Sequence, residues 1–186
     1  NNQVILIKNI YHMLSYAFQV LKQTNYDEVA SEDFENIQDL FSAILAKGIA
    51  RQLKQGLYRE YLPRMENLPV MRGKLDINGT IQNKIQREQV LSCEYNELTE
   101  NNVFNQIIKT TATILMQDQS VTPERKMVLK KVLLFFDNID VIKPSVIKWS
   151  MLGFHGGNQN YRMLLNVCYF VFEGLLLSTE KGTYKM

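Results

Sequence analysis

Two prolines, Pro63 and Pro69, lie in a block of this chain that cannot be helical throughout, and helical stretches flank this block on both sides. Proline lacks the amide donor that a helix interior needs, and it restrains the preceding residue to extended conformations. Short apolar runs at 58–62, 70–75 and 90–95 therefore predict strands. We interpret residues 58–98 as a small β-containing insert in a helical chain.

Apolar residues recur at intervals of three and four on both sides of this insert, which is the spacing of one buried helix face. They predict helices over about 10–21, 34–53 (with a start signal at Ser31), 99–115, 122–136 and 160–177, a short helix over Ile77–Ile85, and short strands at 4–7 and 146–149. The predicted fold class is mostly α with a small β element (α+β). We expect a single domain of residues 1–186, helical over 1–57 and 99–186, because 186 residues suit one core.

Composition narrows the possible function without identifying it. The formal net charge of +2 is too small to indicate a nucleic-acid-binding protein by itself. Cys93 and Cys168 are far apart, and with only His12 and His155 beside them they do not form a zinc-binding pattern. We interpret both cysteines as free thiols of a cytoplasmic protein. No apolar run reaches the ~20 residues that cross a bilayer, so we expect no contact with a membrane.

No complete catalytic motif is present, so we assign no catalytic residue and no metal ligand. The nearest approach to a metal-dependent nuclease is a group of carboxylates, Asp76, Glu94 and Glu97, near Lys74. Acidic residues beside a strand end are more often a solvated rim. A small nuclease using these carboxylates stays open as one alternative.

Basic and amide side chains give the candidate binding residues, for a partner protein or for DNA. Arg72 and Lys74 flank Gly73, where backbone amides can approach a phosphate or carboxylate. The helix expected after Thr122 carries Arg125, Lys126 and Lys130, which are either a solvated face or the surface of a small stand-alone DNA-binding domain. Asn102 and Asn105 share one helix face. They either tie that helix to the insert or contact a base edge or a partner's backbone.

Five segments, in this order, resemble proteins of the McrC family. They are Ile7–Ala17, Gly56–Tyr61, Met71–Leu75, Leu91–Thr99 followed by Asn102 and Asn105, and Tyr161–Cys168. The resemblance covers nearly the whole chain, and it adds Arg162, in the last segment, to the candidate binding residues.

The resemblance implies a subunit of a modified-cytosine restriction system. McrC proteins are partners of McrB, an AAA+ GTPase that recognises methylated cytosine, and they carry a PD-(D/E)xK nuclease domain towards the C-terminus. This chain ends at about the point where that domain begins in the family, so we expect the nuclease to be absent from it. GTP is then expected on the McrB-like partner and Mg²⁺ in the nuclease domain, with no cofactor in this chain.

The leading hypothesis is therefore an interaction module: the non-catalytic part of an McrC-like subunit, which docks to an McrB-like GTPase and contacts DNA as a further option.

Overall fold

The computed structural model describes residues 36–156, 158 and 161–182. Its elements are α3 (Ile37–Gln55), β1 (Glu60–Leu68), β2 (Lys74–Leu75), α4 (Ile77–Ile85), β3 (Leu91–Thr99), α5 (Val103–Gln117), α6 (Pro123–Leu133), three 3₁₀ turns at Leu134–Phe136, Pro144–Val146 and Trp149–Met151, and α7 (Tyr161–Gly182). The α+β class predicted from the sequence is confirmed. The strand expected at 4–7, the helix at 10–21 and the helix start at Ser31 lie outside the described residues.

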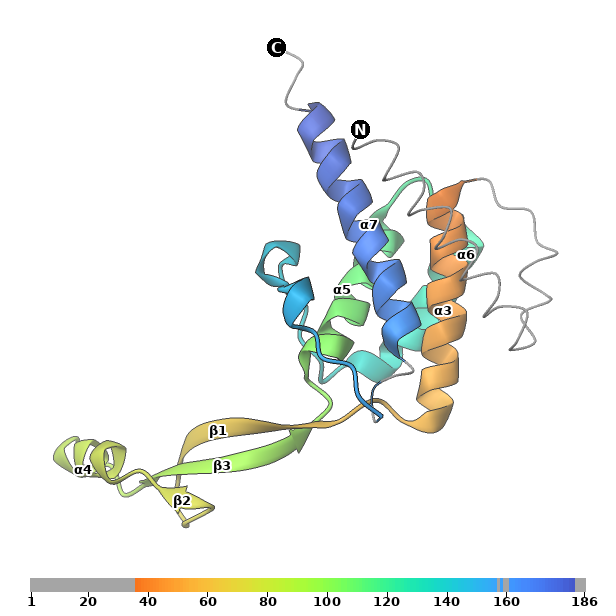
Figure 1. Ribbon diagram of the computed structural model, residues 1–186. Helices are drawn as coiled ribbons and strands as arrows, with labels where there is room; N and C mark the ends of the chain where they lie inside the picture. The colour runs from red at the N-terminus through yellow and green to blue at the C-terminus, as the bar shows by residue number, and fades with distance from the viewer. Residues whose placement is uncertain (1–35, 157, 159–160, 183–186) are drawn as a thin grey trace.

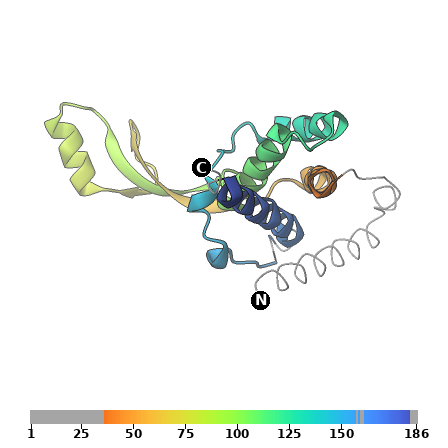
Figure 2. The same cartoon turned by 90° about the horizontal axis from the view of Figure 1, so that it is seen from above.

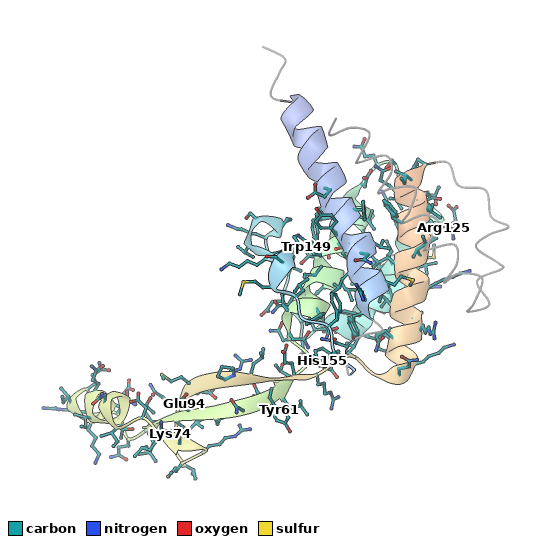
Figure 3. All side chains as sticks on the ribbon, viewed as in Figure 1. Tyr61, Lys74, Glu94, Arg125, Trp149 and His155 are labelled. Carbon is teal, nitrogen blue, oxygen red and sulfur yellow. The ribbon has the colours of Figure 1, made fainter. Side chains whose placement is uncertain are left out.

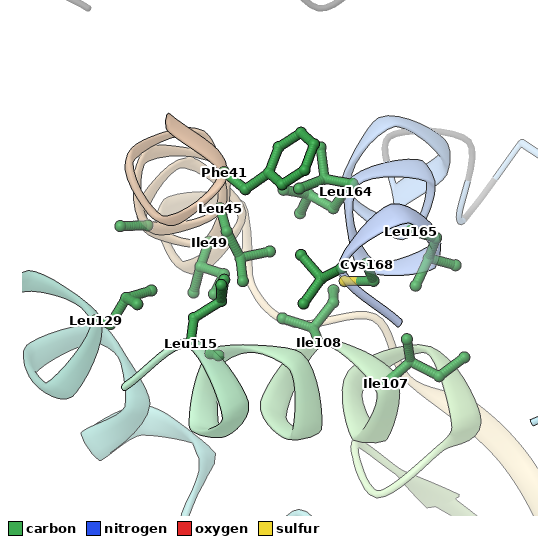
Figure 4. Packing of buried hydrophobic residues seen from close by; sticks show 14 of the residues in the cluster. Phe41, Leu45, Ile49, Ile107, Ile108, Leu115, Leu129, Leu164, Leu165 and Cys168 are labelled. Atoms are coloured by element: carbon green, nitrogen blue, oxygen red, sulfur yellow. The ribbon is translucent and has the colours of Figure 1, made fainter. Parts of the chain in front are cut away.

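Helices α3, α5, α6 and α7 pack side by side into one helical body (Figure 1). Their apolar faces meet in a single core (Figure 4), whose labelled members are Phe41, Leu45, Ile49, Ile107, Ile108, Leu115, Leu129, Leu164, Leu165 and Cys168. Gly48 lets α3 approach α7 closely, because a Cβ at this position would collide with the side chain of Leu164. The spacing of apolar residues thus produces the core that it predicted.

Short polar side chains set the starts of these helices. Asn36 caps α3 by accepting the Asp39 amide at 2.9 Å, and Asn102 caps α5 by accepting the Asn105 amide at 3.2 Å. Pro123 occupies the first turn of α6, as expected. The Thr122 hydroxyl makes no cap and instead donates to the Asp39 carboxylate at 2.9 Å, which ties α6 to α3.

The second part of the molecule is an arm, residues Glu60–Thr99, that projects from one end of the body (Figures 1 and 2). Strands β1 and β3 pair antiparallel over their full length, from Glu60 opposite Thr99 to Leu68 opposite Leu91. The strand order is β1-β3-β2, so β1 is an edge strand, and it carries Pro63. Helix α4, which the isoleucine spacing predicted as a short helix between strands, lies at the far end of the arm (Figure 1).

Two local predictions were wrong. Residues 146–149 form no strand but lie across two 3₁₀ turns; in the described part of the chain, the sheet belongs to the arm and gives this segment no strand to pair with. The apolar spacing over residues 122–136 also predicts Val128 and Phe135 in the buried face of α6 and of the turn after it. They are exposed, while Leu129, Val132 and Phe136 fill that face. None of the described helices is both long and apolar enough to span a bilayer.

Candidate functional site

Polar side chains, rather than apolar ones, fasten α4 to the arm. Asp76 caps the helix, and its carboxylate also accepts the Ser92 hydroxyl at 3.1 Å. Thr80 accepts the Ser92 amide at 3.0 Å and donates to the Asp76 carbonyl at 2.8 Å. One turn further along, the amides of Asn83 and Asn67 bond to each other at 2.9 and 3.4 Å. The inner face of α4 is therefore a hydrogen-bonded face.

The apolar face of α4 points away from the arm. Ile77, Ile81 and Ile85 are 65%, 51% and 76% exposed, whereas Thr80 and Asn83 on the inner face are each 7% exposed. Residues spaced by four lie on one side of a helix, so the isoleucines form a continuous stripe, which we call the isoleucine stripe. A surface helix normally buries its apolar side and exposes its polar side. In α4 this arrangement is reversed.

Arg72 and Lys74 lie at a tight turn beside β2. Gly73 between them has φ of +69°, and a Cβ there would lie 2.5 Å from the Glu94 carbonyl oxygen, so only glycine fits. The Arg72 guanidinium stacks 4.0 Å above the ring centre of Tyr95. Both cations are exposed on the arm, as binding residues must be, and Lys74 pairs in register with Glu94.

The arm joins the body at Tyr58, where both backbone polar groups are held by body side chains. The Tyr58 amide donates to the Tyr161 hydroxyl at 2.8 Å. Its carbonyl accepts from the side-chain amides of Asn102 and Asn105 at 2.8 and 2.9 Å. Burial raises the pKa of Tyr161 to about 12, so this hydroxyl remains protonated at neutral pH. We call these four residues the arm root.

Asn102 and Asn105 are buried, at 1% and 0% exposure. The side-chain amide of Asn105 also donates to the Glu100 carbonyl at 2.8 Å, and its backbone amide donates to Oδ1 of Asn102 at 3.2 Å. Its Oδ1 has no hydrogen-bond partner among the described residues. The tie between helix and insert is thus the role that the geometry supports. Both side chains are buried, so they offer no exposed surface for direct contact with a base edge or a partner, which was the other prediction.

The remaining predicted cations lie on the body. Arg125 reaches Asp39 at 3.7 Å and is mostly covered, whereas Lys130 is exposed and Lys126 is half-buried. Arg162, at the start of α7, is exposed and lies 5.8 Å from the ring centre of Phe154. These positions do not extend the arm site, as Figure 3 shows from the separation of Lys74 on the arm and Arg125 on the body.

The carboxylates considered for a metal-dependent nuclease do not converge. Asp76 caps α4, and Glu97 pairs with Arg64 at 2.9 Å. Glu94 is exposed on β3 of the arm (Figure 3), as expected. Among the described residues, no three His, Cys, Asp or Glu side chains are grouped closely enough to hold a metal ion. The geometry gives the nuclease alternative no support.

Two features of the site were missed in the sequence. Tyr58 and Tyr161 belong to segments that carry the family resemblance, but their contact joins residues 103 positions apart, and no local pattern contains it. The isoleucine spacing predicted α4 correctly without telling which way the stripe faces. The shortness of α4 could have indicated this orientation, because a helix of nine residues flanked by polar residues covers little of a hydrophobic core.

Comparison with known proteins identifies the family. Residues 4–186 match the family model described as McrBC 5-methylcytosine restriction system component. The chain is 25% identical over 185 residues to the type IV methyl-directed restriction enzyme EcoKMcrBC of Escherichia coli strain K12, covering 98% of this chain and 52% of that protein. The chain thus spans about half the length of this relative.

Two solved structures share the fold. A cryo-EM structure of the Thermococcus gammatolerans McrBC complex matches with a TM-score of 0.66 at 22% identity, over 86% of this chain and 49% of the other. A half-complex from a tetradecameric assembly of Thermococcus gammatolerans McrB AAA+ hexamers with bound McrC matches with a TM-score of 0.61 at 22% identity, over 75% and 33%. Because the family model matches almost the whole sequence, the chain belongs to the family of McrBC 5-methylcytosine restriction system components, as its resemblance to McrC predicted.

Proposed function

We propose that this chain is the docking part of an McrC-type restriction subunit, and that its arm binds an McrB-like AAA+ GTPase through the isoleucine stripe. The observation that carries the proposal is the reversed helix α4, whose apolar side faces solvent at the far end of a projecting arm. The solved relative with bound McrC, described as an assembly with McrB AAA+ hexamers, supports the choice of partner.

The energetics favour an apolar groove as the binding surface. Fully burying one isoleucine side chain contributes about 1.5–3 kcal/mol, and three such residues at four-residue spacing follow the pattern of a helix that lies in a groove. Lys84 and Arg87 are exposed in and beside the helix with one exposed carboxylate, Glu88, next to them, so the exposed charge at this end of α4 is net positive. The partner groove should therefore be apolar, with an acidic rim.

The shape of the molecule suits this use. The arm places α4 away from the body, so a partner can surround the tip without meeting α6 or α7 (Figures 1 and 2). Under this proposal GTP is bound and hydrolysed by the partner, and Mg²⁺ for DNA cleavage belongs to a nuclease region of the subunit. We place the complex in the cytoplasm, where the two free, buried cysteines Cys93 and Cys168 stay reduced.

The test is a binding titration of the full chain against its cognate GTPase by calorimetry, with GTP turnover measured in parallel. Ile81→Ser and Ile85→Ser should weaken binding by about tenfold or more, since each ~1.4 kcal/mol lost is tenfold in affinity. Leu134→Ser is the matched control, because Leu134 is 65% exposed but lies on the body. Absence of binding by the unmodified chain, or equal losses in the control, would contradict the proposal.

DNA contact is a second candidate, and it rests on the exposed Lys130 and Lys131 in the last turn of α6. Phosphate contacts by these lysines should give a log–log salt slope of about −0.9 per phosphate. Lys130→Ala and Lys131→Ala should each reduce that slope in a fluorescence titration with duplex DNA. Binding that does not respond to salt would rule this contact out.

A further inference from the structure

The arm is connected to the body by few contacts other than those of Tyr58. Two chain segments cross the junction, one just before β1 and one just after β3. Gly56, with φ of +89° and no neighbouring atom within 4 Å of a Cβ placed there, offers no steric restraint on the first segment. The ion pair of Arg59 and Glu100 joins these two segments to each other at 2.8 Å, and its side chains are 61% and 32% exposed, so it contributes little.

We propose that the arm root is a clamp that fixes the direction of the arm, and that Tyr161 and Asn105 are the positioning residues that make the arm a rigid lever. The clamp acts on the backbone: α7 holds the amide of Tyr58 through Tyr161, and α5 holds its carbonyl through Asn102 and Asn105. Two helices of the body thereby orient one residue of the arm's entry segment from two sides. The inference does not depend on which partner the arm binds.

Burial makes these bonds effective as restraints. Tyr161, Asn102 and Asn105 are all at most 1% exposed, so water cannot readily replace a lost partner. The ring of Tyr58 packs edge-on against Phe104 at 5.5 Å and Tyr161 at 6.0 Å between ring centres. Ring packing holds the residue in place, whereas the hydrogen bonds set the orientation of its peptide groups.

The length of the arm amplifies any freedom at the root. Nine residues of β1 at about 3.3 Å each place α4 roughly 30 Å from the root. A rotation of about 10° at the root then moves the arm tip by about 5 Å over the length of such a strand. Loosening a single hydrogen bond at the root therefore becomes measurable at the tip.

The experiment measures distances between spin labels in the full chain by double electron–electron resonance. One pair, at Lys84→Cys and Lys131→Cys, joins the arm tip to the body, and both positions are exposed. A second pair, at Lys54→Cys and Lys131→Cys, lies wholly within the body. Cys93 and Cys168 are buried and are retained. Tyr161→Phe removes the hydroxyl that accepts the Tyr58 amide and keeps the ring.

The expected result is a wider tip-to-body distribution in Tyr161→Phe, by about 5 Å for a freedom of about 10° at the end of a strand of this length, and an unchanged distribution within the body. Asn105→Ala should widen the first distribution in the same way. Tyr169→Phe, on the same helix, is the matched control and should leave both unchanged. Equal tip distributions in Tyr161→Phe and the control would overturn the proposal. Broadening of the body pair as well would also overturn it, because the hydroxyl would then stabilise the body rather than position the arm.

Discussion

Different interactions hold the body and the arm together. In the body, the described helices bury a continuous apolar core. In the arm, the buried residues are Thr80, Asn83, Ser92 and Cys93, three of them polar. Its large apolar side chains lie mostly in solvent: Tyr61, Met65, Val70, Met71, Ile77, Ile81, Ile85 and Leu98 are all exposed. A strand ladder and a polar network hold the arm together, and its apolar surface remains available.

The difference separates stability from recognition. Apolar burial is the main favourable term in folding, so most of the free energy of unfolding should reside in the body. Exposed side chains of the arm contribute little to that free energy and are free to serve a partner. Substitutions in the two regions should therefore affect different measurements.

The sharpest contrast should come from Leu45→Ala and Ile81→Ala. Leu45 is 0% exposed in the core (Figure 4), and its loss should lower the free energy of unfolding by about 2–5 kcal/mol. Ile81 is 51% exposed on the arm, and its loss should change that free energy by less than about 0.5 kcal/mol. Urea unfolding followed by circular dichroism measures both. Similar losses in the two variants would break the contrast between the regions.

High pH should weaken the body through Tyr161. Its pKa is raised by burial from 10.0 to about 12, so between these pH values the unfolded chain has lost the proton and the folded chain has kept it. The contribution of Tyr161 to stability is therefore complete below about pH 10 and is lost as pH rises towards 12, by about 3 kcal/mol for two pKa units. Cys168, whose pKa burial raises from 9.0 to about 12, acts in the same direction.

Urea unfolding at about pH 8 and about pH 10.5 tests this dependence, because the interval brackets the ordinary tyrosine pKa. Tyr161→Phe should show a shallower decline than the unmodified protein. Tyr61→Phe, whose side chain is 66% exposed on the arm, should follow the unmodified protein. Parallel declines in the unmodified protein and both variants would show that Tyr161 does not cause the loss.

A smaller effect is expected at the junction of the two regions. Asn105→Ala removes one of the two donors to the carbonyl of Tyr58 and one of the two to that of Glu100, which should lower the free energy of unfolding by about 0.5–1.5 kcal/mol for each hydrogen bond lost. Binding by the isoleucine stripe should persist, since Asn105 does not contact α4. A variant that retains full stability would remove Asn105 from the set of structural residues.

The smallest effect should be confined to the arm. Asp76→Ala removes the cap of α4 and the bond to Ser92, at a cost of about 1 kcal/mol for the cap. Hydrogen exchange should accelerate in α4 while the amides of α3 and α5 stay protected. Equally faster exchange in the body helices would show that the arm and body unfold together.

Much of the fold could be predicted from local patterns. Apolar spacing located α3, α5, α6 and α7, and Pro63 and Pro69 correctly separated the insert from the helices. The ends of strands were harder: β1 runs on to Leu68, through Pro63, because an edge strand tolerates a proline that a helix does not. Residues 146–149 have the composition of a strand, but none of the strands in the described part of the chain lies beside them, and composition alone does not show whether a pairing strand is present.

The site was harder to predict than the fold, because it depends on which side of an element faces the body. Arg72 and Lys74 were singled out because they flank a glycine, and the structure places both, exposed, at a tight turn of the arm. The isoleucines of α4 were expected only as a sign of a helix, since burial depends on what lies opposite. Asn105 shows the same limit: its spacing from Asn102 placed both on one face, and only the contact with Tyr58 decides their role.

Strand β1 also affects how copies of the protein meet one another. A projecting ribbon with a bare edge is a template on which a second chain can add a strand, which leads to aggregation. Pro63 removes one amide donor from β1, and Glu60, Arg64 and Glu66 place charges of both signs along it. These residues oppose pairing between the arms of neighbouring molecules. An exposed β-ribbon without such residues would pair more readily with its neighbours.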